Sequence, residues 1–122
     1  MAKHNELGKR GEEIAQKYLE DKGYNILEVN WKAGRAEIDL IAKHNNILIF
    51  IEVKTRSNTL FGNPERAVNA KKEALLIRAA HAYLHKIDYE EEVRFDVISV
   101  VIPKDDRVEI THFEDAFFPG LD

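Results

Sequence analysis

The sequence predicts a single α/β domain in which helices flank a mixed central β-sheet, with the element order α-β-β-β-α-β-β. Its 122 residues are the length of one domain. Stretches with helical spacing of apolar residues alternate with short runs rich in β-branched residues, which are typical of strands. The near-continuous apolar run at residues 47–51 indicates a strand buried on both faces, in the middle of the sheet.

The composition is that of a globular protein and excludes several kinds of chemistry. Hydrophobic residues make up 44% and charged residues 33% of the chain, and there is no cysteine. Disulfides, thiolate metal sites and thiol catalysis are therefore ruled out. The longest apolar run is far shorter than the roughly 20 residues of a membrane span, and residues 1–6 lack the apolar segment of a signal peptide. We expect a cytoplasmic protein without a membrane partner.

Charge is distributed unevenly along the chain. Residues 1–80 hold 14 Lys and Arg against 11 Asp and Glu, or +3, whereas residues 81–122 hold 4 against 11, or −7, which together give the net charge of −4. The first two-thirds of the chain can form a phosphate-binding face despite the acidic total. A solvated surface of mixed charge fits the same composition.

The first helix is predicted at residues 5–22, where Gly23 suits the left-handed position after a helix. Its apolar side chains fall within one arc of roughly 140° at 100° per residue. Glu12 lies at the edge of this arc, whereas Glu13 points well away from it. Of these two adjacent acids, only Glu12 is expected to face the body of the protein.

The remaining elements follow from apolar runs and from the turns between them. Lys32-Ala33-Gly34-Arg35 is a basic turn, and Asn45-Asn46 is a two-residue hairpin turn, since asparagine tolerates positive φ. Asn63-Pro64-Glu65 is typical of a helix start, and that helix runs to about residue 85. Strands are predicted at residues 24–30, 36–43, 47–54, 93–102 and 108–113.

Acidic residues inside two of these hydrophobic strands are the most informative feature. Alternation places Ile38, Leu40 and Ala42 on one face of their strand, and Glu37, Asp39 and Ile41 on the other. With a two-residue turn, the numbers of paired positions sum to 91. Asp39 would then lie opposite Glu52, and Glu37 opposite Lys54. Directly opposed Cβ atoms are about 4.5–5.5 Å apart, so the Asp39 and Glu52 carboxylates would repel each other.

This repulsion requires a divalent cation, a shared proton or the nearby Lys54 to offset it. Mg²⁺ or Mn²⁺ is the simplest answer, because hard cations take oxygen ligands and often use one or two carboxylates plus substrate phosphate. A fixed lysine beside them can stabilise charge that develops on a phosphate. The alternative is a purely structural ion-pair network in which Lys54 neutralises a carboxylate.

The stretch Glu37-Ile38-Asp39-Leu40-Ile41, followed by Phe50-Ile51-Glu52-Val53-Lys54-Thr55-Arg56, resembles the signature of metal-dependent nucleases, an Asp and then Glu-x-Lys on a β-hairpin. From about residue 7 to 101, the wider pattern resembles the YraN-like uncharacterised family within that nuclease superfamily. The motifs that carry this likeness are Gly8-x-x-Gly11-Glu12, Asn30-Trp31, Phe61-Gly62, the helix with Ala70-Lys71, and Phe95-Asp96-Val97.

The resemblance implies a restriction-endonuclease-like fold similar to that of archaeal Holliday junction resolvases. It maps Glu12, Asp39, Glu52 and Lys54 onto the catalytic residues, with Asp39, Glu52 and Glu12 as metal ligands. Ala36 departs from the family pattern, which has glycine at this position. Glu37 either supports Lys54 or faces solvent.

Four further residues are candidates for contact with nucleic acid: Trp31, Arg35, Arg56 and Lys71. An arginine can clamp a phosphate, and a tryptophan can stack on a splayed base. The alternatives are that the three cations are solvated and that Trp31 packs in the core. His81 and His85 have the i, i+4 spacing of a helical metal pair, but Ala82 stands where the zinc-hydrolase motif needs glutamate.

We therefore expect Mg²⁺- or Mn²⁺-dependent hydrolysis of DNA phosphodiesters, with structured or branched DNA as substrate. One alternative is a nuclease-like module that binds nucleic acid without cutting it. Another is an interaction protein that merely tolerates its acidic cluster. A chain of 122 residues offers little surface for selecting a substrate, so a homodimer or a larger DNA-processing complex is expected.

Overall fold

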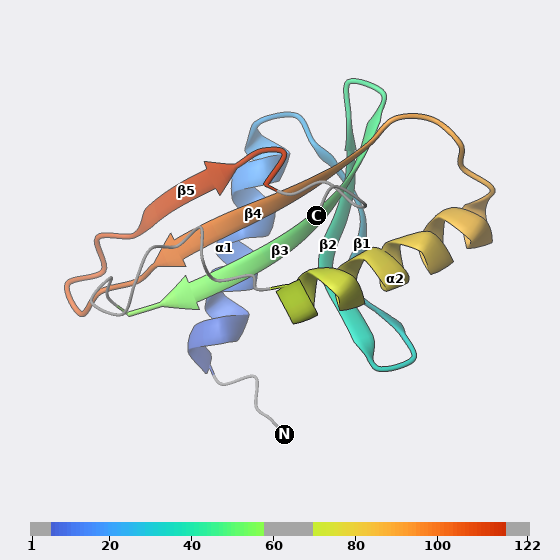
Figure 1. Ribbon diagram of the computed structural model, residues 1–122. Coiled ribbons are helices and arrows are strands. Elements are labelled where there is room, and N and C mark those ends of the chain that lie inside the picture. Colours follow the sequence, from blue (N-terminus) through green and yellow to red (C-terminus); the bar gives the residue numbers. More distant parts are fainter. Residues whose placement is uncertain (1–5, 58–69, 117–122) are drawn as a thin grey trace.

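The computed structural model describes residues 6–57 and 70–116, and its elements follow the predicted order (Figure 1). The predicted helix start at Asn63 and the Phe61-Gly62 motif lie outside the described residues. The described elements are α1 (Glu6–Asp21), β1 (Asn25–Ala33), β2 (Ala36–His44), β3 (Ile47–Arg56), α2 (Ala70–Ile87), β4 (Val93–Val101) and β5 (Glu109–Phe113).

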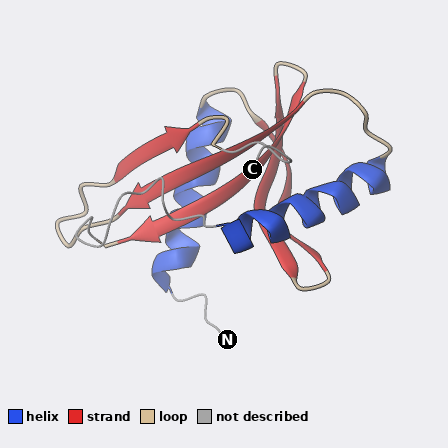
Figure 2. Ribbon diagram, in the orientation of Figure 1, coloured by secondary structure: helices blue, strands red, loops and turns tan. Residues whose placement is uncertain are grey.

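The five strands form one mixed sheet in the order β1-β2-β3-β4-β5. The β3–β4 pair is parallel and the other pairs are antiparallel. Figure 2 shows α1 on one face of this sheet and α2 on the other. The crossover that a parallel pair requires contains α2. The predicted fold class, a mixed sheet flanked by helices, is confirmed.

Each face of the sheet has its own hydrophobic cluster, and β3 contributes to both. Ile49 and Ile51 pack with Ala15 and Leu19 of α1, whereas Phe50 packs on the α2 side. The continuous apolar run at the centre of β3 is therefore buried on both faces, as predicted. Within the described residues, no helix is long and apolar enough to cross a membrane.

The predicted turns are confirmed at two places and shifted at a third. Gly23 has φ of 92°, and the bonds Gly23 N–H to Glu20 O and Tyr24 N–H to Leu19 O close α1 as a Schellman motif. Asn45 and Asn46 have φ of 52° and 66°, as a two-residue hairpin turn requires. The expected basic turn is shorter than predicted, because Lys32 and Ala33 continue β1 by pairing with Glu37 and Ala36 of β2.

Gly11 allows α1 to approach β3 closely. A Cβ atom built on Gly11 would lie 1.9 Å from Thr55 Oγ1 and 2.7 Å from Thr55 Cβ. No real Cβ tolerates such a separation, so only glycine permits this helix–strand spacing. This close contact brings the part of α1 that carries the next residue, Glu12, near the end of β3.

We predict that Gly11→Ala destabilises the protein by about 1–3 kcal/mol, because the added methyl group forces α1 away from Thr55. The same substitution in a Thr55→Gly background should be neutral or stabilising, because alanine is the better helix former once the clash is gone. Urea denaturation of the four proteins in this double-mutant cycle measures the difference. Equal effects of Gly11→Ala in both backgrounds would contradict the proposed contact.

Candidate active site

The β2–β3 register agrees with the prediction from the hairpin turn as far as Leu40. Pairs run from His44–Ile47 to Leu40–Ile51, and their numbers sum to 91. The described ladder ends there, so the expected pairs Asp39–Glu52 and Glu37–Lys54 are not part of it. Instead, the backbone N–H of Val53 donates a 2.7 Å hydrogen bond to Asp39 Oδ2. A carboxylate of β2 thus takes the place of a backbone acceptor.

The strand faces also change at Asp39, contrary to the alternation that we expected. Leu40 and Ala42 pack in the α1 cluster, but Ile38 packs in the α2 cluster. The expectation that Ile38 shares a face with Leu40 is therefore wrong. The change of face coincides with the end of the β2–β3 ladder, because residues 36–38 of β2 pair with β1 and the pairing with β3 begins only at Leu40.

Glu52 is buried on the α2 side, with 3% of its surface exposed. Its Oε2 atom lies 2.8 Å from Lys72 Nζ, which comes from the first turn of α2. Its Oε1 atom is buried and has no hydrogen-bond partner in the described structure. A buried charge with an unsatisfied oxygen is costly, because the lost hydration is only partly replaced.

Lys72 is the site residue that the sequence analysis missed. In the alternative of a structural ion-pair network, Lys54 was expected to neutralise a carboxylate, but Lys72 forms the ion pair with Glu52. Lys71, the candidate for a phosphate contact, is exposed. Helical spacing does not separate Lys72 from Lys71, because Lys71 lies four residues before Leu75 and Lys72 four before Leu76, and both leucines pack on the α2 side of the sheet. Burial alone would lower the pKa of Lys72, but contact with Glu52 and the charges of Asp39 and Glu37 raise it.

Asp39 is held in a form that resists ionisation. Burial raises its pKa well above the ordinary value, and the charges of Glu52 and Glu12 raise it further. The Glu52 side chain next to it acts in the same direction, and the hydrogen bond from the Val53 N–H opposes these effects. The three predicted acids are therefore near enough to interact, and a proton on Asp39 is one way in which their repulsion is relieved.

A pocket of about 210 Å³ leads to Asp39 and Lys72. Glu37 and the backbone turn of the β1–β2 hairpin form one wall, and Leu75 and Leu76 of α2 form the other. Glu37 therefore faces this pocket and influences Lys72 rather than pairing with Lys54 in the ladder. Ala36 is buried in the same wall.

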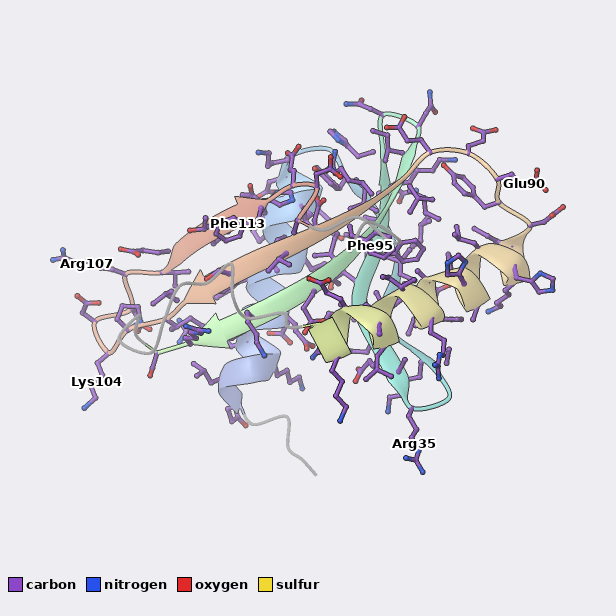
Figure 3. The ribbon with its side chains drawn as sticks, in the orientation of Figure 1. Arg35, Glu90, Phe95, Lys104, Arg107 and Phe113 are labelled. Carbon is purple, nitrogen blue, oxygen red and sulfur yellow. The ribbon has the colours of Figure 1, made fainter. Side chains whose placement is uncertain are left out.

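The remaining candidates lie at different distances from this pocket. Arg35 is at the tip of the β1–β2 hairpin and points away from the body of the protein (Figure 3), although it lines the pocket rim. Lys54 and Arg56 are partly exposed at the end of β3. The Trp31 ring packs edge-on against the Tyr83 ring, with the ring centroids 5.1 Å apart, and Lys86 Nζ lies over the Trp31 ring. These contacts favour a packing role for Trp31 over base stacking. His81 and His85 are exposed on α2.

In the part of the chain that the structure describes, no three His, Asp or Glu side chains are grouped as ligands of one metal ion. The predicted set Glu12, Asp39 and Glu52 is accordingly not arranged as a three-ligand site. Asp39 and Glu52 have the closest mutual interaction, and both offer the hard oxygen ligands that Mg²⁺ and Mn²⁺ prefer.

A second buried acid, Asp96 of β4, shows what a satisfied carboxylate looks like in this protein. Arg94 donates two 2.9 Å hydrogen bonds to it, His112 Nε2 lies 2.7 Å from Oδ2, and Asp115 N–H donates at 3.0 Å. Burial alone would raise its pKa, but the bonds from His112, Arg94 and Asp115 hold the pKa below the ordinary value. Asp96 therefore anchors β5 and the following turn to β4, whereas Asp39 and Glu52 lack such compensation.

The fold and this site define a small mixed α/β protein with an acidic pair, Asp39 and Glu52, beside Lys72. The chain belongs to the uncharacterised protein family UPF0102, whose family model matches residues 11–100. A UPF0102 protein of Phocaeicola vulgatus is 52% identical over 121 residues, covering 99% of each chain. A UPF0102 protein of Flavobacterium psychrophilum is 48% identical over 118 residues, 97% of this chain and 98% of that one. A third, of Bacteroides thetaiotaomicron, is 48% identical over 121 residues, 99% of each chain.

We predict that Asp39→Asn and Asp96→Asn change stability in opposite directions at pH 7. The raised pKa means that ionised Asp39 destabilises the folded state, so its amide should add roughly 1 kcal/mol to the free energy of unfolding. The lowered pKa means that ionised Asp96 stabilises it, so its amide should cost about 3 kcal/mol. Each substitution is the matched chemical control for the other.

The pH dependence follows from the same two shifts. The gain from Asp39→Asn should be absent below pH about 4, near the unfolded-state pKa, and should grow as the pH rises through the folded-state pKa. The stability that Asp96 contributes is complete above that unfolded value and is lost as the pH falls through its lower folded-state pKa. Urea titrations at several pH values test both signs, and a loss of stability in Asp39→Asn at pH 7 would refute the first.

Proposed function

We propose that this protein is a metal-dependent endonuclease of restriction-endonuclease-like type that hydrolyses phosphodiester bonds in structured or branched DNA. The observation that carries the proposal is the buried Glu52, whose Oε1 atom has no partner although a second acid, Asp39, lies beside it. An arrangement that costs stability and is only partly compensated, by Lys72 on Glu52 and by the Val53 N–H on Asp39, is typical of a functional site.

The residues present fit a hard divalent cation. Asp39 and Glu52 would hold it, and Glu12, on α1, would position a water molecule beside it. Mg²⁺ commonly uses one or two protein carboxylates and keeps several waters, so a three-carboxylate cage is not needed. When bound, such an ion activates a water molecule and neutralises charge on the phosphate oxygens.

The roles of the protein's own groups follow from their positions. Lys54 is two residues beyond Glu52 on the same face of β3, where its ammonium would stabilise charge that grows on the phosphate. Arg35 at the pocket rim, with Arg56 and Lys71, would bind flanking phosphates of the strand. A protein that acts on DNA in this way would be cytoplasmic. A homodimer or larger complex would supply the surface that recognises the DNA structure.

A second candidate function is a module that binds nucleic acid without cutting it. The ion pair between Lys72 and Glu52 favours this alternative, because an ammonium already neutralises one of the acids. Binding that persists in EDTA, together with no cleavage across DNA structures and metals, would support the module and contradict the nuclease.

We predict that the purified protein cleaves labelled DNA in Mn²⁺ and that Asp39→Asn and Lys54→Ala each reduce the rate by about 100-fold or more, since each removes a group that acts on the reacting phosphate. Linear, single-stranded, flap and four-way DNA, each with and without Mn²⁺, form the substrate panel.

The matched controls are Glu13→Gln and Lys104→Ala, which remove the same charges at exposed positions outside the pocket. Figure 3 shows Lys104 at the end of the molecule that carries the β4–β5 turn. Both controls should cleave as fast as the unmodified protein. Full activity of folded Asp39→Asn and Lys54→Ala would eliminate the proposed site.

A further inference from the structure

Lys72 reaches Glu52 from the opposite layer of the fold. It lies on the face of α2 that carries the buried Leu76, Ala79 and Tyr83, and 41% of its side chain remains exposed. Its ammonium occupies one oxygen of Glu52 at 2.8 Å, and the other oxygen has no partner. Within the described residues, only one of the two Glu52 carboxylate oxygens therefore has a partner, whereas both oxygens of Asp96 accept hydrogen bonds.

A divalent cation that binds Glu52 would weaken the ion pair between Glu52 and the ammonium of Lys72. Two positive charges a few ångströms apart repel each other strongly in a partly buried site. The lysine stem is flexible, and its root on α2 lines the same pocket as Asp39. If a cation releases the ammonium, Lys72 stays in the pocket through which a phosphate must enter.

We infer that Lys72 is a phosphate-positioning residue that Glu52 holds in the free protein and releases to a phosphate oxygen of the nucleic acid when a divalent cation binds. This inference rests on the proposed function, because it assigns a cation and a phosphodiester to the same pocket. Lys72 is distinct from Lys54, since Lys72 lies on α2 and reaches Glu52, whereas Lys54 lies on β3. The exposed neighbour Lys71 offers a matched control with the same charge on the same helical turn.

The first test is a double-mutant cycle that needs neither metal nor cleavage. Affinity for labelled four-way DNA is measured in EDTA for Lys72→Met and Lys71→Met, each with Glu52 and with Glu52→Gln. Glu52→Gln imitates the release of Lys72, so Lys72→Met should weaken binding about threefold or more beyond its effect beside the intact Glu52. In that background it should also lower the slope of log affinity against log salt by about 1.

Lys71→Met should have the same effect in both backgrounds, because Lys71 does not pair with Glu52. Equal effects of Lys72→Met in the two backgrounds would overturn the inference, as would a Glu52→Gln protein that does not bind this DNA. Glu52→Gln with Lys72→Met leaves no stranded buried charge, so this comparison remains available if Lys72→Met alone does not fold.

The second test is the rise of Tm with Mn²⁺ in the absence of DNA. Lys72→Met should reach half of its rise at a several-fold lower Mn²⁺ concentration than the unmodified protein, because the competing ammonium is gone. Lys71→Met should match the unmodified protein, and Asp39→Asn should lose the response. A response in the unmodified protein that Lys72→Met leaves unchanged overturns the inference alone. No Mn²⁺ response in the unmodified protein overturns the proposed function and, with it, the inference.

Discussion

The hydrogen bond from the Val53 backbone to the Asp39 carboxylate is the interaction on which the candidate site depends. It replaces a rung of the β2–β3 ladder and lets β2 turn toward β1 without leaving the Val53 N–H unsatisfied. It also holds one oxygen of Asp39 beside β3, where Glu52 raises its pKa. A backbone donor thus fixes two acids near each other although their charges oppose the arrangement.

The protein contains buried acids of two kinds, and the difference between them separates structure from function. Asp96 is surrounded by Arg94, His112 and a backbone N–H, so its charge contributes to the cohesion of the sheet. One oxygen of Glu52 is paired with the Lys72 ammonium, and the other has no hydrogen-bond partner in the described structure. The pKa of Asp39 is raised, so this carboxyl group ionises less readily. The carboxylate of Asp96 thus has a full set of partners within the fold, whereas Glu52 Oε1 has none among the described residues.

The sequence was a good guide where local patterns decide the structure. The Asn45-Asn46 turn fixed the β2–β3 register, and helical spacing correctly distinguished the half-buried Glu12 from the exposed Glu13. Two features could not be predicted because they depend on tertiary contacts. The change of face between Ile38 and Leu40 arises where β2 leaves one neighbour and stays with the other.

The partner of Glu52 was the second such feature. Reasoning within one strand pointed to Lys54, but the ion pair crosses from the sheet to a helix. Only the docking of α2 decides that Lys72, and not its neighbour Lys71, lies over β3. The need for glycine in the Gly8-x-x-Gly11-Glu12 motif likewise depends on a tertiary contact, the packing of Thr55 against Gly11.

The position of α2 in the parallel crossover has a consequence for the order in which the chain can assemble. The β1–β2–β3 meander consists of contacts between neighbouring strands, which close quickly, whereas the β3–β4 pair must wait for the longer loop that contains α2. Asp39 and Glu52 can therefore first meet while water still surrounds them and screens their repulsion. The helix that later expels this water also delivers Lys72, so the dehydrating step and the counter-charge arrive together.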